Sequence, residues 1–208
     1  MFFTPNNHKS AGLPHNPMKA IISPRPIAWV ASKGNDGSLN LAPYSFFNGI
    51  SDDPAMIAIS IASNPDGSPK DSLRNIEETG AFSISIVGAA QMEEMNISSG
   101  NYPYGESEFD AAGLGLADSE TIDVPRVAGS PAALECTHYQ TIALPKGPDG
   151  GHYALVLGTV TGVYIDDSVI VDGLVSYAKY NPVCRLGYKD YAKITDVFAM
   201  TRPIIERP

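Results

Sequence analysis

The segment best suited to chemistry places a charge and a hydroxyl at the start of a predicted short helix. Lys70, Asp71 and Ser72 precede a stretch whose apolar residues recur three apart and which ends at Gly80. We expect Asp71 or Ser72 to cap this helix, leaving free backbone N–H groups beside an ammonium and a hydroxyl. Together these groups suit a phosphomonoester. An ordinary solvated helix start is the alternative, since a cap residue next to a lysine is common on protein surfaces.

A second candidate segment combines aromatic rings with small polar side chains: Tyr44, Ser45, Phe46, Phe47 and Asn48. Aromatic faces, backbone N–H groups and small polar side chains can hold a flat heteroaromatic ring, stacking on one surface and hydrogen-bonding along its edge. Ordinary core packing of the aromatic residues is the alternative.

The elements that must position these segments are predicted to be mainly β-strands. Residues 27–32 alternate with a period of two, as in a strand with one buried face, and the turn 33–38 reverses the chain into a second strand. The apolar run 55–62 predicts a strand buried on both faces. Residues 82–87 form another strand, and a long hairpin follows from residue 132, with a glycine-rich turn at 145–151.

Three phrases carry a family resemblance. PRPIAWVAS followed by NLAPYSFFN resembles the flavin reductase-like family of FMN-binding split barrels. KDSLRNIEETG is similar to that family's phosphate-side segment, where Lys-Asp-Thr is usual and Ser72 here replaces the threonine. The closing stretch from Arg185 resembles the signature Arg-x-Gly-Gly-x-x-Tyr, with Tyr188 in place of the second glycine. The agreement extends from about residue 20 to residue 203.

The resemblance implies a mainly β fold, a six-stranded antiparallel split barrel with a few short helices. It also implies a homodimer with FMN at the subunit interface. A barrel this small fills its own interior with side chains, so a cofactor must lie outside it. We expect residues 1–19 to form an N-terminal arm, residues 20–203 a single domain, and residues 204–208 a C-terminal tail.

We expect the phosphate at the start of the helix and the ring edge at the aromatic segment. Asp71 is the weakest member, because its carboxylate would repel a phosphate; capping or a contact with Lys70 suits it better. Arg25 lies between two prolines and is held extended, which suits an ion pair or an anion contact. The expected cofactor-binding residues are Arg25, Tyr44, Ser45, Phe46, Phe47, Asn48, Ser60, Lys70, Asp71 and Ser72.

His152, at the mouth of the long hairpin, is the one candidate catalytic side chain. Some flavin reductases carry a histidine at the start of the matching strand, beside the nicotinamide or substrate. The spacing from His152 to Gly158 is longer than that pattern, so a solvated loop histidine is the alternative. No nucleophile motif, phosphate-binding loop or metal-ligand spacing occurs, and we expect no metal.

Without a protein nucleophile, the reactivity must come from a cofactor, and a flavin accepts hydride from NADH or NADPH at N5. The first hypothesis is an NAD(P)H-dependent oxidoreductase that reduces free flavin or a small acceptor. The second is an electron carrier reduced by a partner protein, which an acidic patch around the flavin edge would favour. The third is a binding module with an altered site, which the departures at Ser72 and Tyr188 keep open.

The composition narrows the class of partner. A net charge of −9 argues against nucleic acid or an anionic membrane, and an anionic ligand needs a local basic pocket. Cys136 and Cys184 are too few for a disulfide framework and are expected to be structural thiols. No apolar run approaches the ~20 residues that span a bilayer, and the sequence opens with no apolar signal core. We therefore expect a cytoplasmic protein without a membrane partner.

Overall fold

The computed structural model describes residues 1–147 and 150–205. Residues 148–149 of the predicted glycine-rich turn and residues 206–208 of the predicted tail lie outside the described residues. No helix among the described residues is long and apolar enough to cross a membrane. The proposed division of the chain into arm, domain and tail stays a prediction.

The fold is mainly β, as predicted. The main sheet is built from the strands β2 (Ala28–Lys33), β3 (Leu39–Tyr44), β4 (Phe47–Asp52), β5 (Ala55–Ala62), β6 (Ala81–Ile86), β9 (Ala132–Ala143) and β10 (Tyr153–Ile165). Shorter strands are β1 (Arg25–Pro26), β7 (Leu116–Ala117), β8 (Arg126–Val127), β11 (Ile170–Val171), β12 (Leu174–Val175), β13 (Val183–Arg185) and β14 (Tyr191–Lys193). The α-helices are α1 (Met18–Ile21), α2 (Asp71–Thr79), α3 (Met92–Ile97), α4 (Glu108–Ala111) and α5 (Tyr177–Tyr180). Single 3₁₀ turns occupy Pro5–Asn7, Ala89–Gln91 and Asp167–Val169.

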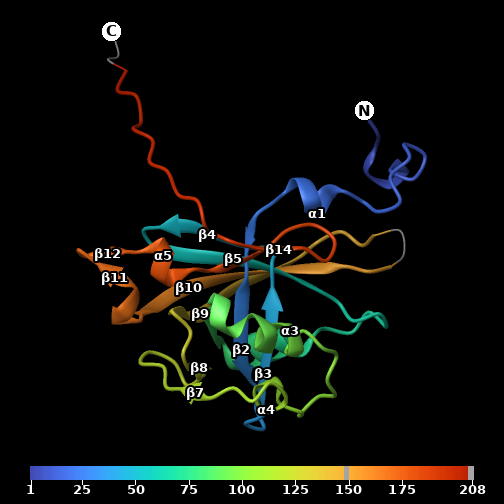
Figure 1. Ribbon diagram of the computed structural model, residues 1–208. Coiled ribbons are helices and arrows are strands. Elements are labelled where there is room, and N and C mark those ends of the chain that lie inside the picture. Colours follow the sequence, from blue (N-terminus) through green and yellow to red (C-terminus); the bar gives the residue numbers. More distant parts are fainter. Residues whose placement is uncertain (148–149, 206–208) are drawn as a thin grey trace.

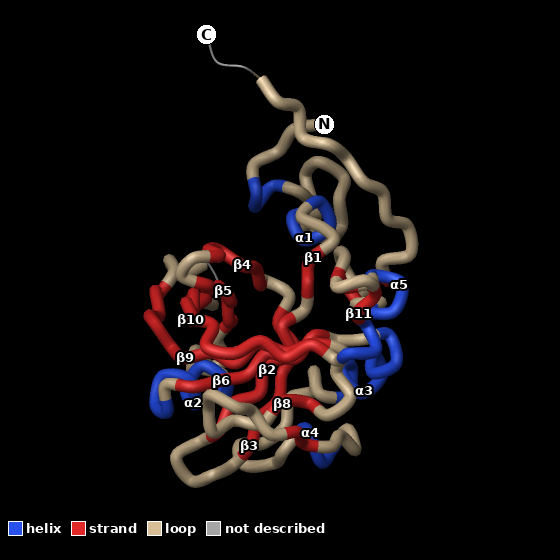
Figure 2. The backbone as a smooth tube through the Cα atoms, turned by 90° about the vertical axis from the view of Figure 1, so that its left-hand side faces the viewer, coloured by secondary structure: helices blue, strands red, loops and turns tan. Residues whose placement is uncertain are grey.

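The seven strands of the main sheet run in the order β3-β2-β6-β9-β10-β5-β4, and every pair is antiparallel. Its two outer strands, β3 and β4, are consecutive in the chain and joined only by Ser45 and Phe46. The sheet must therefore curl on itself (Figure 2). The Ser60 N–H of β5 donates to the Phe46 carbonyl at 2.8 Å, which extends the pairing of β4 with β5 into this connection. The predicted count of six strands is not confirmed, because this sheet has seven.

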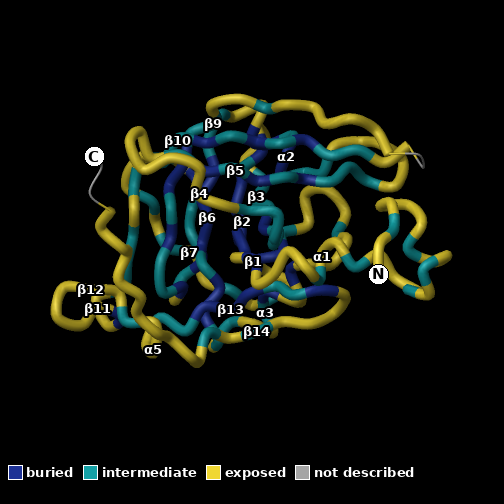
Figure 3. The backbone as a smooth tube through the Cα atoms, turned by 90° about the horizontal axis from the view of Figure 1, so that it is seen from above, coloured by how far each residue is buried: buried dark blue, intermediate teal, exposed yellow. Residues whose placement is uncertain are grey.

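The predicted hairpin of residues 27–44 is confirmed, but its first strand is buried differently from the prediction. Trp29 and Val30 are consecutive and both fully buried. Val30 belongs to the core inside the curled sheet, and Trp29 to a second core between the sheet and the segments that cover it. The residues on the two faces of this strand alternate, but both faces are largely apolar. The alternation alone therefore does not show which face is buried, or that both are. β2 is therefore buried on both faces (Figure 3).

β5 shows the opposite departure. Ile57, Ile59 and Ile61 are buried inside the curled sheet, whereas Met56 and Ser60 on the other face are partly exposed. The prediction that this strand is buried on both faces is therefore wrong for the single chain. A continuous apolar run cannot by itself separate a strand buried by its own chain from one with an open face.

Helix α2 closes one end of the inner core. Leu73 and Ile76 are buried in it, as their spacing predicts, and Gly80 ends the helix in the left-handed conformation with φ 76°. α3 buries Met95 in the second core but leaves Met92 40% exposed. Residues 194–205 form no helix or strand and extend away from the sheet (Figure 1).

Gly158 in β10 is predicted to be required for inner-core packing. A Cβ at Gly158 would lie 2.6 Å from Phe82 Cζ and 3.2 Å from Ile57 Cδ1. Gly158→Ala should lower the free energy of unfolding by about 1–3 kcal/mol, because the core has no room to accept the methyl group. Urea denaturation measures it. Gly49→Ala in β4 is the control, since a Cβ there meets nothing within 4 Å. Equal losses for both variants would contradict the packing argument.

Candidate functional site

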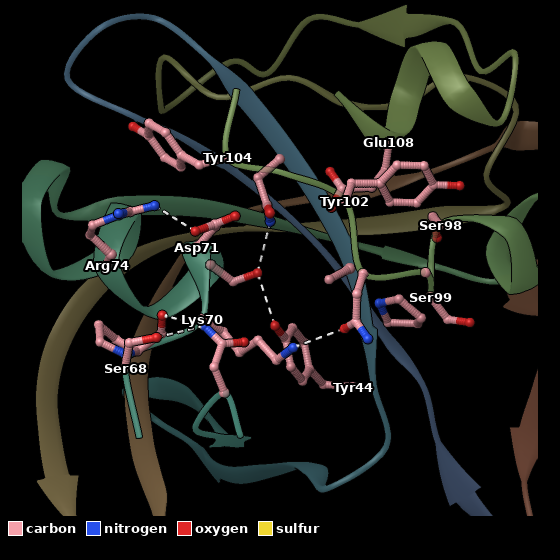
Figure 4. A pocket seen from close by; sticks show the side chains of 18 of the residues that line it. Tyr44, Ser68, Lys70, Asp71, Arg74, Ser98, Ser99, Tyr102, Tyr104 and Glu108 are labelled. Carbon is pink, nitrogen blue, oxygen red and sulfur yellow. Dashed lines mark hydrogen bonds and ion pairs between the residues drawn. The ribbon is translucent and has the colours of Figure 1, made fainter. Parts of the chain in front are cut away.

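A cavity of about 600 Å³ opens at the start of α2, and we call it the α2 cavity (Figure 4). Three parts of the chain line it: the end of β3, the loop and helix start at 64–74, and the segment 98–108. Only the first two of these parts contain residues that the sequence predicted to belong to a site. Tyr44, Lys70, Asp71 and Ser72 all line this cavity, so the structure brings four of the predicted residues together.

Ser72 lies at the centre of a polar network. Its side chain is 1% exposed, and its Oγ accepts hydrogen bonds from Asn40 Nδ2 at 2.8 Å and from the Tyr44 hydroxyl at 3.0 Å. A hydroxyl has two acceptor lone pairs and one proton. With both lone pairs used, the Ser72 proton remains to be donated to a further acceptor.

The start of α2 has no side-chain cap within the described residues. Lys70, not Asp71 or Ser72, occupies the N-cap position, and its side chain makes no capping bond. The predicted capping role is therefore wrong for both residues. The Lys70 ammonium donates to Asn101 Oδ1 at 3.2 Å across the cavity. An uncapped helix start leaves its first backbone N–H groups available to an anion.

Asp71 is paired with a residue on its own helix. Its Oδ1 accepts from Arg74 Nη2 at 2.5 Å, an ion pair one turn along α2 (Figure 4). The Arg74 guanidinium also lies 3.9 Å from the centre of the Tyr104 ring. The predicted contact of Asp71 with Lys70 does not form. Because Arg74 offsets the carboxylate, Asp71 repels an anion in the cavity less than an unpaired aspartate would.

Burial raises the pKa values of two acidic groups that line the α2 cavity. It raises the pKa of the Tyr44 phenol to about 12, so this hydroxyl stays a hydrogen-bond donor at neutral pH. Burial also raises the pKa of Glu108, and the Leu41 N–H, which donates to Glu108 Oε2 at 2.8 Å, partly offsets this rise. The charge of Asp71 makes a smaller contribution in the same direction.

A second hollow, of about 500 Å³, adjoins the α2 cavity, and Pro43 and Ser99 line both. We call it the cationic hollow, because its lining includes Lys19, Arg25 and Arg185. Of the predicted residues, Arg25 and Ser45 line it. The two spaces together offer a continuous lining from the start of α2 to the turn after β13.

Arg25 forms no ion pair within the described residues, and the anion contact considered for it stays a prediction. Its side chain is buried, and its Nη1 donates to the carbonyls of Lys19 and Ile22, while Nη2 donates to the Leu186 carbonyl at 2.7 Å. Arg25 therefore ties the segment before β1 to the turn after β13. Its Nε is buried without a partner in the described part of the chain.

The remaining predicted ring-binding residues are more scattered. Phe46 lies 5.6 Å from Lys19 Nζ and 5.7 Å from the Arg25 guanidinium, measured to the ring centre. Phe47 packs against the inner core, and Asn48 is exposed on β4. Ser60 is half-buried on β5 and bonds the Phe46 carbonyl through its backbone. The lining of the two spaces includes none of Phe46, Phe47, Asn48 and Ser60, and their role in ring binding stays a prediction.

His152 lies outside both spaces. It lines a separate hollow beside Ser63, Asn64 and Pro65, and the last two also line the α2 cavity. Its backbone carbonyl accepts from the Ser63 N–H at 2.9 Å, while its Nδ1 is buried without a partner in the described residues. His152 lies in a loop and is partly exposed, so the structure does not decide between the solvated loop histidine and the catalytic candidate.

Several lining residues went unrecognised in the sequence as site residues: Asn40, Arg74, Ser98, Ser99, Asn101 and Glu108. Most come from a segment far from the helix start in the chain, so no local pattern connects them. Tyr102 and Tyr104, from the same segment, also line the α2 cavity. The one local signal was the spacing of Asp71 and Arg74, three apart on a helix.

A family model described as "Flavin reductase like domain" matches residues 19–181. The chain belongs to this family. Flavin reductase-like proteins are thus its relatives, and the resemblance predicted from the sequence is confirmed.

Solved structures of this kind superpose on nearly the whole chain. Component B of nitrilotriacetate monooxygenase from Bacillus cereus has a TM-score of 0.87 and 30% identity, covering 96% of this chain and 98% of its own. The 2-nitrobenzoate 2-nitroreductase NbaA from Pseudomonas fluorescens has a TM-score of 0.78 and 32% identity, and the match covers 89% of this chain and 88% of its own. A split barrel domain protein from Shewanella frigidimarina NCIMB 400 has a TM-score of 0.79 and 21% identity, and the match covers 98% of this chain and 100% of its own. At this identity it supports the fold alone. Together these comparisons support a flavin-related oxidoreductase.

Glu108 provides a pH test of the α2 cavity. A raised pKa means that the ionised carboxylate is disfavoured in the native state, so stability is lost as pH rises through the folded-state value. Glu108→Gln keeps an acceptor for the Leu41 N–H but carries no charge. The variant should therefore unfold at a higher temperature than the wild type at about pH 7.5, with the difference vanishing near about pH 4.

Thermal unfolding at both pH values measures this, and the exposed Glu106→Gln is the control. A Glu108→Gln difference that is the same at both pH values would reject the assigned shift.

Proposed function

We propose that this protein is an FMN-dependent oxidoreductase that takes reducing equivalents from NADH or NADPH and passes them to free flavin or a small acceptor. The observation that carries the proposal is the uncapped start of α2 facing the α2 cavity, with Lys70 and the free proton of Ser72 beside it. A phosphate of FMN supplies the acceptors that these donors lack.

The residues of the α2 cavity fit this role on three counts. Ser72 has both lone pairs used and one proton left. Tyr44 stays protonated at neutral pH, so it holds the Ser72 hydroxyl in that orientation. Asp71 is offset by Arg74, which leaves Lys70 as the cation nearest the helix start that is free of an acidic partner in the described residues. The phosphate would lie among Lys70, Ser72 and the first N–H groups of α2.

The flavin ring is proposed to lie beside the β3–β4 connection. Pro43 and Ser45 line the space next to the α2 cavity, so a ring attached to a phosphate at α2 would reach them. When bound, FMN supplies the hydride and electron chemistry. The protein's own tasks are to bind the phosphate, orient the ring and keep one ring face open to a second substrate.

A homodimer is part of the proposal. The half-exposed face of β5 and the exposed apolar side chains Tyr139 and Val163 on β9 and β10 are open in the single chain. A second copy would cover such a surface. We propose that the flavin lies where the two copies meet, as the family resemblance implies.

The names of the relatives support an oxidoreductase that hands electrons to a separate acceptor, since one is a monooxygenase component and one a nitroreductase. The carrier hypothesis called for an acidic patch near the flavin. The space beside Pro43 is lined by Lys19, Arg25 and Arg185 instead, which favours a small co-substrate over an acid-lined docking patch.

The decisive experiment is an absorbance spectrum of the purified protein with added FMN, followed by anaerobic NADH or NADPH. Bands near ~370 and ~450 nm report bound oxidised flavin, and their bleaching by either nucleotide supports the reductase and identifies the donor. Sedimentation of the same sample measures the dimer. A yellow protein that neither nucleotide bleaches would indicate the carrier, and a protein that takes up no flavin would reject the proposal.

The phosphate assignment predicts a difference between two flavins. Replacing Lys70 and Ser72 together with alanine should weaken FMN binding by about 100-fold but riboflavin by only a few-fold, because charge-assisted phosphate bonds are lost only for FMN. Fluorescence titration measures both constants. Lys33→Ala is the control, since Lys33 pairs with Asp123 away from the α2 cavity. Similar losses for both flavins would show that the phosphate lies elsewhere.

A further inference from the structure

The cationic hollow carries an imbalance of charge that the FMN phosphate does not explain. Lys19, Arg25 and Arg185 line it, and no aspartate or glutamate is among the described residues lining it. The ion pairs found in the described part of the chain, Lys33–Asp123 and Arg74–Asp71, involve none of the three. Three unpaired cations at one hollow are unusual in a protein whose net charge is −9.

Two of these cations repel each other at close range. Burial lowers the pKa of Arg25, and the charge of Arg185 lowers it further. Arg25 is 6% exposed, and its Nε is buried with no partner among the described residues. Its other nitrogens bind backbone carbonyls, which hold it in place but do not neutralise it. An anion entering the hollow would relieve the repulsion between these two guanidinium groups.

The side chain of Arg185 is held in place by contacts with two tyrosines. Its Nη2 donates to the Tyr188 carbonyl at 2.5 Å, and its guanidinium lies 4.2 Å from the centre of the Tyr191 ring. These contacts fix the plane of the guanidinium and reduce the entropy lost when it binds a ligand. Lys19 makes no hydrogen bond through Nζ within the described residues and lies near the Phe46 ring.

The aromatic lining and the volume of the hollow suit a planar anion. Tyr188 and Tyr191 are among its lining residues, and the His15 ring lies 5.8 Å from that of Tyr188. Its volume of about 500 Å³ falls within the range of small-molecule sites, roughly 300–1,000 Å³. The α2 cavity, on the other side of Pro43 and Ser99, has its own cation and helix start for the cofactor phosphate.

We propose that the cationic hollow binds the anionic group of the second substrate, a carboxylate or phosphate held by Arg185 and Lys19 next to the flavin. This inference rests on the proposed function, because it places the substrate by reference to the flavin. Arg25 positions the hollow by tying its two walls together, since it bonds the carbonyls of Ile22 and Leu186. The site selects for charge, so a neutral analogue of the same ring binds less well.

The test uses binding, with and without FMN, rather than turnover alone. Benzoate, benzamide and inorganic pyrophosphate are titrated into the protein by calorimetry. Arg185→Gln and Lys19→Gln should each weaken the favoured anion by about 10-fold while leaving benzamide and FMN binding within about 2-fold, because a charge-assisted contact is lost only for the anion. Lys193→Gln, which removes a nearby exposed charge outside the lining, should change neither.

The two probes distinguish the two sources of the anion. Preference for benzoate assigns the hollow to a carboxylate-bearing acceptor, and preference for pyrophosphate assigns it to the phosphates of a nucleotide donor. Lys19→Gln guards against a folding defect in Arg185→Gln, because its Nζ holds no structural bond in the described part of the chain.

Three results would overturn the inference: neither anion binds the wild type, Lys193→Gln weakens the anion equally, or the Arg185 and Lys19 variants lose FMN as strongly as the anion. The last would assign the hollow to the flavin itself. A protein that binds no FMN would instead reject the proposed function, while anion titration of the FMN-free protein still tests the hollow.

Discussion

Strand β2 lies between two hydrophobic cores, and the position of both candidate spaces depends on it. Val30 faces the core inside the curled sheet and Trp29 the core outside it, so a slip of one residue would exchange every side chain between the two. The register of β2 therefore fixes the register of β3. That register places Pro43, opposite Trp29, at the border of the two spaces and Tyr44, opposite Ala28, in the lining of the α2 cavity.

The same strand also positions α2. Asn75 of α2 donates to Ser32 of β2 at 3.2 Å, while Leu73 and Ile76 pack into the inner core. The helix start is thus held at a fixed place relative to β3, and Ser72 comes within hydrogen-bond reach of Asn40 and Tyr44. The hydrogen bonds to Ser72 at the α2 cavity therefore depend on the packing of Leu73 and Ile76 in the inner core.

Features governed by neighbouring residues were predictable from the sequence. The hairpin followed from its turn, and α2 followed from the spacing of Leu73 and Ile76 and from Gly80. The features that the sequence did not predict depend on residues that are far apart in the chain. The prolines around Arg25 predict an extended backbone, but they carry no information about the Leu186 carbonyl 161 residues away. The lining by residues 98–108 is equally non-local.

Tyr188 shows how a departure from the family pattern can belong to the site. Its φ of 56° lies in the left-handed region, where a residue other than glycine costs roughly 1–2 kcal/mol. Glycine, usual at this place in the resembling signature, would avoid that cost. The tyrosine gives the cationic hollow an aromatic wall, and its carbonyl holds Arg185. Since glycine would also provide the carbonyl, what the tyrosine adds at this position is its side chain. Tyr188 belongs to the lining of the cationic hollow together with Lys19, Arg25 and Arg185, so its aromatic side chain offers a proposed planar anion a surface to lie against.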